Sequence, residues 1–188
     1  MTLNFVIIVL AYVLCHGLTD LIIAPIQRIF LPETTIFAAL IYLPHGVRVL
    51  ATWAYGWKAV PPLLAGTLLS VGLFSSDQEV SFLSPQLLEG VFLGSVSALL
   101  AFECARLAGH NLYAGQGRKL SWRGMIVVGA LSSVINSIGQ TFIYAGLIGL
   151  EDLGEVLIVY AIGDLFGVIL GMVALMFVFR WVRLFSST

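Results

Sequence analysis

The sequence predicts an all-α integral membrane protein, a bundle of about six transmembrane helices with both termini in the cytoplasm. Of its 188 residues, 60% are hydrophobic and 10% are charged, whereas a soluble domain carries about 25% charged residues. Nearly every stretch between charged clusters is apolar for about 17 to 25 residues, the length that one helix needs to cross a bilayer. Because no long polar segment interrupts the chain, residues 1–188 are predicted to form a single transmembrane domain.

Apolar runs separated by turn residues place the six helices. Pro25 follows the first run, Gly56 and Pro61 lie between the second and the third, and Ser75 and Asp77 follow the third. The predicted spans are residues 3–24, 36–55, 60–74, 82–107, 125–150 and 156–179.

Basic residues mark the connections that should face the cytoplasm, where Lys and Arg are in excess. They are Lys58 after the second span, Arg106, Arg118, Lys119 and Arg123 around the longest polar connection, and Arg180 and Arg183 in the tail. Acidic residues such as Asp77 and Glu151 dominate the opposite connections. Six spans with both termini inside satisfy this distribution. Trp53, Tyr55 and Trp57 then lie at the inner interface, where aromatic belts are found.

Polar residues inside the spans are the main functional clues, because a charged group in the bilayer costs at least about 2.5 to 3.5 kcal/mol on insertion scales. Counting along the spans places Asp20, Glu89, His45, Asp164, His16 and Gln140 in the outer half of the bundle and Arg48 near the middle. The residues predicted to form one outward-facing polar pocket are His16, Asp20, His45, Arg48, Gln140 and Asp164. His16 and Asp20 are four residues apart and share one helical face. A pair of Arg48 with Asp164 or Asp20 would lower the cost of burial. Such a pair either locks helices together or lines a site for a ligand or a proton.

Helix breaks and small residues extend this candidate site. Pro44 and Gly46 are predicted to interrupt the second span, and a broken backbone in a membrane has to be satisfied by neighbouring groups or by water in a cavity. Glycines at helical spacing are predicted to let helices approach closely. They are Gly163, Gly167 and Gly171 in the sixth span, and Gly90 and Gly94 in the fourth.

Metal binding, nucleic-acid binding and catalysis are not indicated. A metal site needs three or four converging donors, and His16 and His45 fit histidines that are hydrogen-bonded between helices. The net charge of −1 suggests no nucleic-acid partner. The His-Glu-x-x-His and Gly-x-Ser-x-Gly motifs are absent, so no catalytic residue is predicted. The sequence identifies no cofactor.

Three ordered motifs carry a family resemblance: Tyr42-Leu43-Pro44-His45-Gly46, then Gly56-Trp57 with Pro61 and Gly66, and finally Gly163-Asp164-Leu165-Phe166-Gly167-Val168. Together they resemble the MASE-type integral membrane sensor domains of bacteria, the first membrane-associated sensor class. Leu43, His45 and Ala161 depart from the family pattern. Family members usually have more spans and an attached output domain. The resemblance therefore implies a shortened, stand-alone sensor of the bacterial inner membrane that acts through a partner.

These observations predict a non-enzymatic membrane sensor or binding module, which recognises a small ligand in the outer-half polar pocket and acts through a partner protein within the bilayer. Two alternatives stay open. One is an accessory or assembly subunit of a larger membrane complex, in which the polar pairs are structural. The other is a substrate-capture subunit of a small-solute transporter, because size and helix count are similar to the capture subunits of energy-coupling-factor vitamin transporters.

Overall fold

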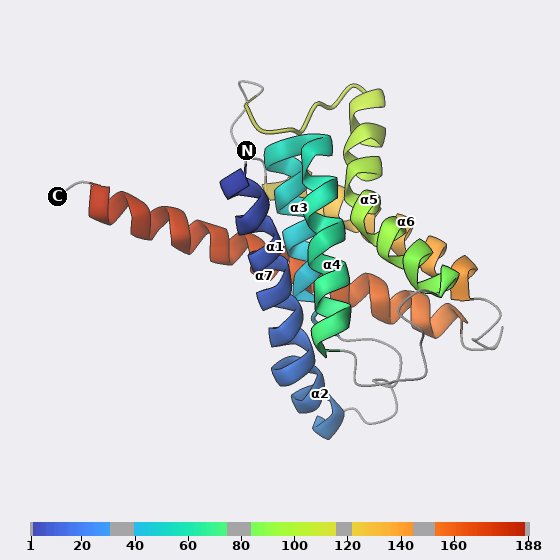
Figure 1. Cartoon of the computed structure of the whole chain (residues 1–188). Coiled ribbons are helices and arrows are strands. Elements are labelled where there is room, and N and C mark those ends of the chain that lie inside the picture. Colours follow the sequence, from blue (N-terminus) through green and yellow to red (C-terminus); the bar gives the residue numbers. More distant parts are fainter. Residues whose placement is uncertain (1, 31–39, 75–83, 116–121, 145–152, 187–188) are drawn as a thin grey trace.

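The computed structural model describes residues 2–30, 40–74, 84–115, 122–144 and 153–186, and every regular element in these ranges is helical (Figure 1). The elements in chain order are α1 (Thr2–Leu18), the π-helical turn η1 (Thr19–Ile23), α2 (Ala24–Phe30), α3 (Leu43–Tyr55), the 3-10 turn η2 (Gly56–Ala59), α4 (Val60–Phe74), α5 (Pro85–Leu107), α6 (Trp122–Tyr144) and α7 (Leu153–Ser186). The predicted all-α fold is confirmed for these ranges.

Four helical stretches of the described chain are long and apolar enough to cross a membrane, judged by length and composition. They are Thr2–Phe30, Leu43–Phe74, Pro85–Leu107 and Trp122–Ile143, and α7 adds a shorter apolar part, Ala161–Phe177. Large apolar side chains such as Leu14, Phe92 and Phe142 are exposed on the outside of the bundle, as expected of a surface that faces lipid. The count of six crossings and the orientation of the termini stay predictions.

The stretch Leu43–Phe74 is a hairpin rather than one straight rod. Gly56 has a φ of 58°, a conformation that favours glycine, and the chain reverses there. Tyr12 on α1 contacts both arms of the hairpin. Its hydroxyl lies 2.7 Å from a guanidinium nitrogen of Arg48 on α3, and its Cβ lies 2.9 Å from the position that a Cβ of Gly66 on α4 would take. The second and third predicted helices are therefore separate, and α4 has the predicted bounds of 60–74.

Helix ends differ from the predicted spans in several places. α5, α6 and α7 begin at Pro85, Trp122 and Leu153, where residues 82, 125 and 156 were predicted. The first helix continues past the predicted end at residue 24, because the π-helical turn η1 precedes Pro25 and its wider backbone accommodates a residue that cannot donate a hydrogen bond. α7 runs on through Arg180 to Ser186, past the predicted end at residue 179. The predicted start of the second span at residue 36 and the end of the fifth at residue 150 lie outside the described residues.

Pro44 and Gly46 begin a helix instead of interrupting one, which corrects the predicted break. Residues 40–42 are not helical, α3 starts at Leu43, and Pro44 occupies its first turn. A proline is tolerated there because the N–H that it lacks would have no partner within the helix. The irregular backbone therefore lies just ahead of His45, at the end of α3 that carries the polar residues.

Two apolar clusters hold the bundle together. One lies where α3, α5, α6 and α7 meet, and it contains Val49, Ala98, Ala101, Phe102, Met125, Val128, Val168 and Met172. The other joins α1 to the α3–α4 hairpin through Ile8, Tyr12, Ala51, Ala59 and Leu63. α7 runs crosswise to α1, α3 and α4 in Figure 1, and its C-terminal part extends beyond the other helices.

The start of α1, the turn between α3 and α4 and residues 108–115 after α5 gather at one end of the bundle (Figure 1). The backbone N–H of Ala114 donates to the carbonyl oxygen of Trp53 at 3.0 Å, which ties the connection after α5 to the end of α3. Lys58 and Arg106 therefore lie at the same end. This grouping of basic residues is the one on which the predicted orientation depends.

Candidate functional site

Two other helices hold the start of α3 in place. The N–H groups at the start of a helix have no partner within it. The N–H of Leu43 donates to the hydroxyl oxygen of Thr19 at 3.3 Å, and the N–H of Tyr42 donates to the carbonyl oxygen of Gly163 on α7 at 3.0 Å. These bonds set the height and the rotation of α3 relative to α1 and α7.

Glycines allow α3 and α7 to approach until their backbones touch. A Cβ on Gly46 would collide with the carbonyl oxygen of Gly167, and a Cβ on Gly167 would collide with the carbonyl oxygen of Tyr42. A Cβ on Gly171, one turn further along α7, would stand 3.3 Å from the Cα of Gly46. The predicted glycine face of the sixth span therefore packs on α3 within the chain.

Arg48 lies in a cradle formed by two tyrosines and a glycine. Its Nη2 donates to the Tyr12 hydroxyl at 2.7 Å, and its Cζ lies 5.5 Å from the ring centroid of Tyr12 and 5.6 Å from that of Tyr42. Gly94 of α5 leaves room for the guanidinium, because a Cβ there would stand 2.8 Å from Nη2. A hydrogen bond to a charged group contributes about 1.5 to 3 kcal/mol and each cation–π contact about 0.5 to 2 kcal/mol. These contributions offset an insertion cost of about 2.5 to 3.5 kcal/mol.

His45 and Asp164 face each other in the interior, where their side chains are 0% and 1% exposed. Nδ1 of His45 lies 3.4 Å from Oδ2 of Asp164, and Nε2 lies 3.2 Å from the carbonyl oxygen of Gly129. Because a carbonyl only accepts, Nε2 donates to it, and Nδ1 faces the carboxyl group with a lone pair or a second proton. One proton between Nδ1 and Oδ2 makes this contact attractive, whichever of the two atoms holds it.

A second polar pair lies on the first helix, beside the Arg48 cradle. Nε2 of His16 is 3.1 Å from Oδ2 of Asp20, with side-chain exposures of 14% and 38%. The His16 ring stacks on the Tyr12 ring at 6.2 Å and meets the Tyr42 ring edge-on at 6.1 Å. The two tyrosines therefore connect this more open pair to the buried one. We call Tyr12, Tyr42, His45, Arg48 and Asp164 the polar core.

Eight buried side-chain atoms have no hydrogen-bond partner among the described residues. They are Nδ1 of His16, Nδ1 of His45, Nε of Arg48, Oγ1 of Thr52, Oγ of Ser133, Oδ1 of Asn136, Oγ of Ser137 and Oδ2 of Asp164. All but one belong to α3, α6 and α7, which pack on one another. An unpaired buried polar group costs about 1 to 3 kcal/mol, and folded interiors rarely leave so many groups unpaired.

The predicted ion pair between Arg48 and an aspartate is not formed in the part of the chain that the structure describes. Each aspartate pairs with a histidine instead, although Asp164 is near enough to interact electrostatically with Arg48. The partner of Arg48 is Tyr12, which sequence reasoning missed. Tyr12 lies four residues before His16, so the helical spacing that grouped His16 with Asp20 would have included it.

Gln140 joins two other helices of the bundle. Its Nε2 donates to the carbonyl oxygen of Gly90 at 3.1 Å, which joins α6 to α5. Within the described ranges, no three His, Cys, Asp or Glu side chains converge on a point that could hold a metal ion. The polar core thus combines a fixed cation, a carboxyl group, an imidazole and phenol hydroxyls. Such a set can bind a small polar solute or hold a proton.

The opposite end of the bundle carries a polar contact outside the spans. The Tyr113 hydroxyl donates to Oε1 of Glu103 at 2.8 Å, and Glu103 also pairs with Arg106. Burial and, next, the hydrogen bond to Glu103 raise the pKa of Tyr113 above its usual range. The neutral phenol is therefore the stable form there.

Comparison with known proteins identifies no relative of this chain. No protein-family model, no curated protein and no solved structure matches it. The resemblances to MASE-type sensors and to vitamin-capture subunits stay predictions.

Proposed function

We propose that this chain is a non-enzymatic sensor or binding module of the bacterial inner membrane, which recognises a small polar solute at the polar core and acts through a partner protein. The polar core lies at the start of α3, away from the turn that carries Lys58. With the Lys58 end in the cytoplasm, as the positive-inside rule favours, the polar core belongs to the outer half of the membrane.

The observation that carries this proposal is the set of unpartnered polar atoms in the interior. Nε of Arg48 is a donor with no partner among the described residues, and Oδ2 of Asp164, which has only its 3.4 Å contact with Nδ1 of His45, is an acceptor when its carboxyl group is ionised. A solute with both acceptors and donors would satisfy both residues. Each hydrogen bond to a charged group contributes about 1.5 to 3 kcal/mol. A polar cluster that only locks helices together is expected to satisfy its own donors and acceptors.

The position of α3 offers a route from the polar core to a partner. Its first turn is bonded to Thr19 on one side and to the Gly163 carbonyl on the other. A solute that draws Arg48 and Asp164 together would shift α3 against α7 across a contact in which the glycine backbones touch directly. We infer that α7 carries the response, because its C-terminal part reaches beyond the bundle (Figure 1).

Gentle extraction from native membranes, followed by mass spectrometry of bound small molecules, tests this proposal. We expect one solute to accompany the wild-type chain and to fall about tenfold or more in Arg48→Met and Asp164→Asn, which each remove a charge-assisted bond. Glu89→Gln is the matched control, because Glu89 is an exposed acid of α5 outside the polar core. Equal solute content in all four proteins would refute the proposed site.

A subunit of a larger membrane complex is the second candidate, favoured by the exposed end of α7. Met176 and Phe177, in the C-terminal part of α7, are 46% and 57% exposed. A stoichiometric protein partner in mild detergent would support it, with loss of that partner in Phe177→Ser and no loss in Phe142→Ser, a matched exposed phenylalanine on α6. A chain that always migrates alone contradicts it.

A further inference from the structure

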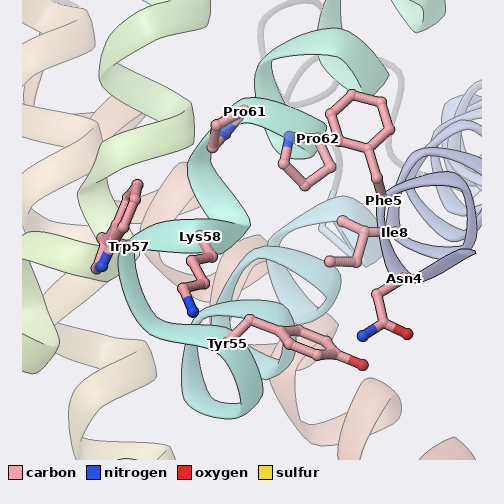
Figure 2. Close-up of a pocket in the computed structure, with 8 residues that line it drawn as sticks. All are labelled: Asn4, Phe5, Ile8, Tyr55, Trp57, Lys58, Pro61 and Pro62. Atoms are coloured by element: carbon pink, nitrogen blue, oxygen red, sulfur yellow. The ribbon is translucent and has the colours of Figure 1, made fainter. Parts of the chain in front are cut away.

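A pocket lies at the end of the bundle opposite the polar core, between the start of α1 and the α3–α4 turn (Figure 2). Its volume is ≈ 290 Å³, close to the lower limit of about 300 Å³ for small-molecule sites. Asn4, Phe5 and Ile8 of the first helix line it, together with Tyr55, Lys58 and Pro62 of the hairpin.

Polar and apolar groups occupy different sides of this pocket. Figure 2 shows the Lys58 amino group, the Tyr55 hydroxyl and the Asn4 amide on its lower side, and the rings of Phe5 and Pro62 on its upper side. An amino group, a phenol and an amide together supply donors for an anion. The apolar side has no hydrogen-bond donor for an anion, but it can pack against a hydrocarbon chain. The ligand that fits both sides is an amphiphile with an anionic head.

The charge of the pocket and its position in the bundle indicate where this amphiphile comes from. None of the side chains that line the pocket is acidic, and Lys58 lies at the basic end of the bundle, which the positive-inside rule assigns to the cytoplasmic face. Tyr55 and Trp57 are 41% and 66% exposed beside it, as aromatic residues at a membrane interface are. That leaflet is rich in anionic lipids, and a Lys or Arg near its surface gains about 1 kcal/mol.

We propose that this pocket binds an anionic phospholipid of the cytoplasmic leaflet. The lipid phosphate accepts a hydrogen bond from Lys58, and the Tyr55 hydroxyl and the Asn4 amide, which lie together on the other side of the pocket floor in Figure 2, donate to other oxygens of the head group. The first carbons of an acyl chain pack on Phe5. The lipid joins the start of α1 to the hairpin and thereby stabilises the two elements that also contribute Tyr12 and Arg48 to the polar core. This inference does not depend on the solute proposed for the polar core.

The test counts lipid adducts on the full chain by native mass spectrometry and measures its melting temperature in detergent. The probes are phosphatidylglycerol, phosphatidylcholine with the same acyl chains, and inorganic phosphate. We expect phosphatidylglycerol to bind more tightly than phosphatidylcholine and to raise the melting temperature. Its affinity should fall about fivefold in Lys58→Gln and stay unchanged in Arg123→Gln, an exposed basic residue of α6 outside the pocket.

A second variant separates a lipid from a free anion. Phe5→Gln, at a side chain that is 42% exposed, should weaken phosphatidylglycerol binding while leaving the fold intact. Equal affinity for the two lipids, or an unchanged affinity in Lys58→Gln, would overturn the proposal. Inorganic phosphate that stabilises the chain as much as phosphatidylglycerol does would overturn it too, because the apolar side would then contribute nothing.

Discussion

A substitution at Gly167 of α7 tests whether the contact between α3 and α7 holds the polar core together. In Gly167→Ala the new methyl group meets the carbonyl oxygen of Tyr42, a backbone atom that cannot rotate away. An ordinary van der Waals contact requires about 3.5 Å, so the two helices must separate by roughly 1 Å or more. The separation also lengthens the contact between His45 and Asp164, which is already 3.4 Å.

The expected loss of stability follows from these contacts. Overpacking a close interface costs about 1 to 3 kcal/mol, and the hydrogen bond from Tyr42 to Gly163 contributes about 1 kcal/mol more. We therefore expect Gly167→Ala to lower the free energy of unfolding by about 2 to 4 kcal/mol. Equilibrium unfolding in mixed micelles with increasing denaturing detergent measures this quantity.

Gly171→Ala is the matched control, on the same face of the same helix. Its Cβ would stand 3.3 Å from both the Cα of Gly46 and a methyl carbon of Leu50, so shifts of a few tenths of an ångström relieve it. We expect a loss below about 1 kcal/mol. If the two variants unfold alike, α3 and α7 are not in backbone contact and the reasoning about the polar core is wrong.

Two further predictions concern the tyrosines. Tyr12→Phe removes the hydroxyl that accepts from Arg48, so the free energy of unfolding should fall by about 1.5 to 3 kcal/mol, measured in the same micelle assay. Tyr42→Phe should cost less, because the one hydrogen-bond partner of its hydroxyl among the described residues is the Tyr12 hydroxyl, at 3.4 Å, and equal losses would contradict the cradle geometry. Tyr113 has a raised pKa, so its neutral phenol stabilises the fold below pH about 10, and this contribution is lost as the pH rises through the folded-state pKa. The phenolate absorbance of Tyr113 should therefore appear at a higher pH than that of free tyrosine, and Glu103→Gln should lower that pH. A Tyr113 titration in the wild type like that of free tyrosine would count against the bond.

Local regularities made much of the fold predictable. Composition indicates a membrane bundle, and the turn at Gly56 with Pro61 predicted the bounds of α4. The spacing of four between His16 and Asp20 predicted a shared face, and the structure pairs them. The two prolines were harder to interpret. Pro25 follows a π-helical turn and Pro44 starts a helix, because the backbone around each proline depends on neighbours that a one-dimensional pattern does not contain.

The amino-acid sequence by itself determined that this chain is helical, that its surface suits lipid, and which polar residues lie within its apolar helices. Only the tertiary structure decided the partners of those residues, turning Arg48 toward Tyr12 and Asp164 toward His45. The physical reason is that each pairing depends on how far every helix rotates about its axis and how closely it approaches its neighbours. Both are set where backbones meet, at glycines such as Gly167, and no single helix contains that information.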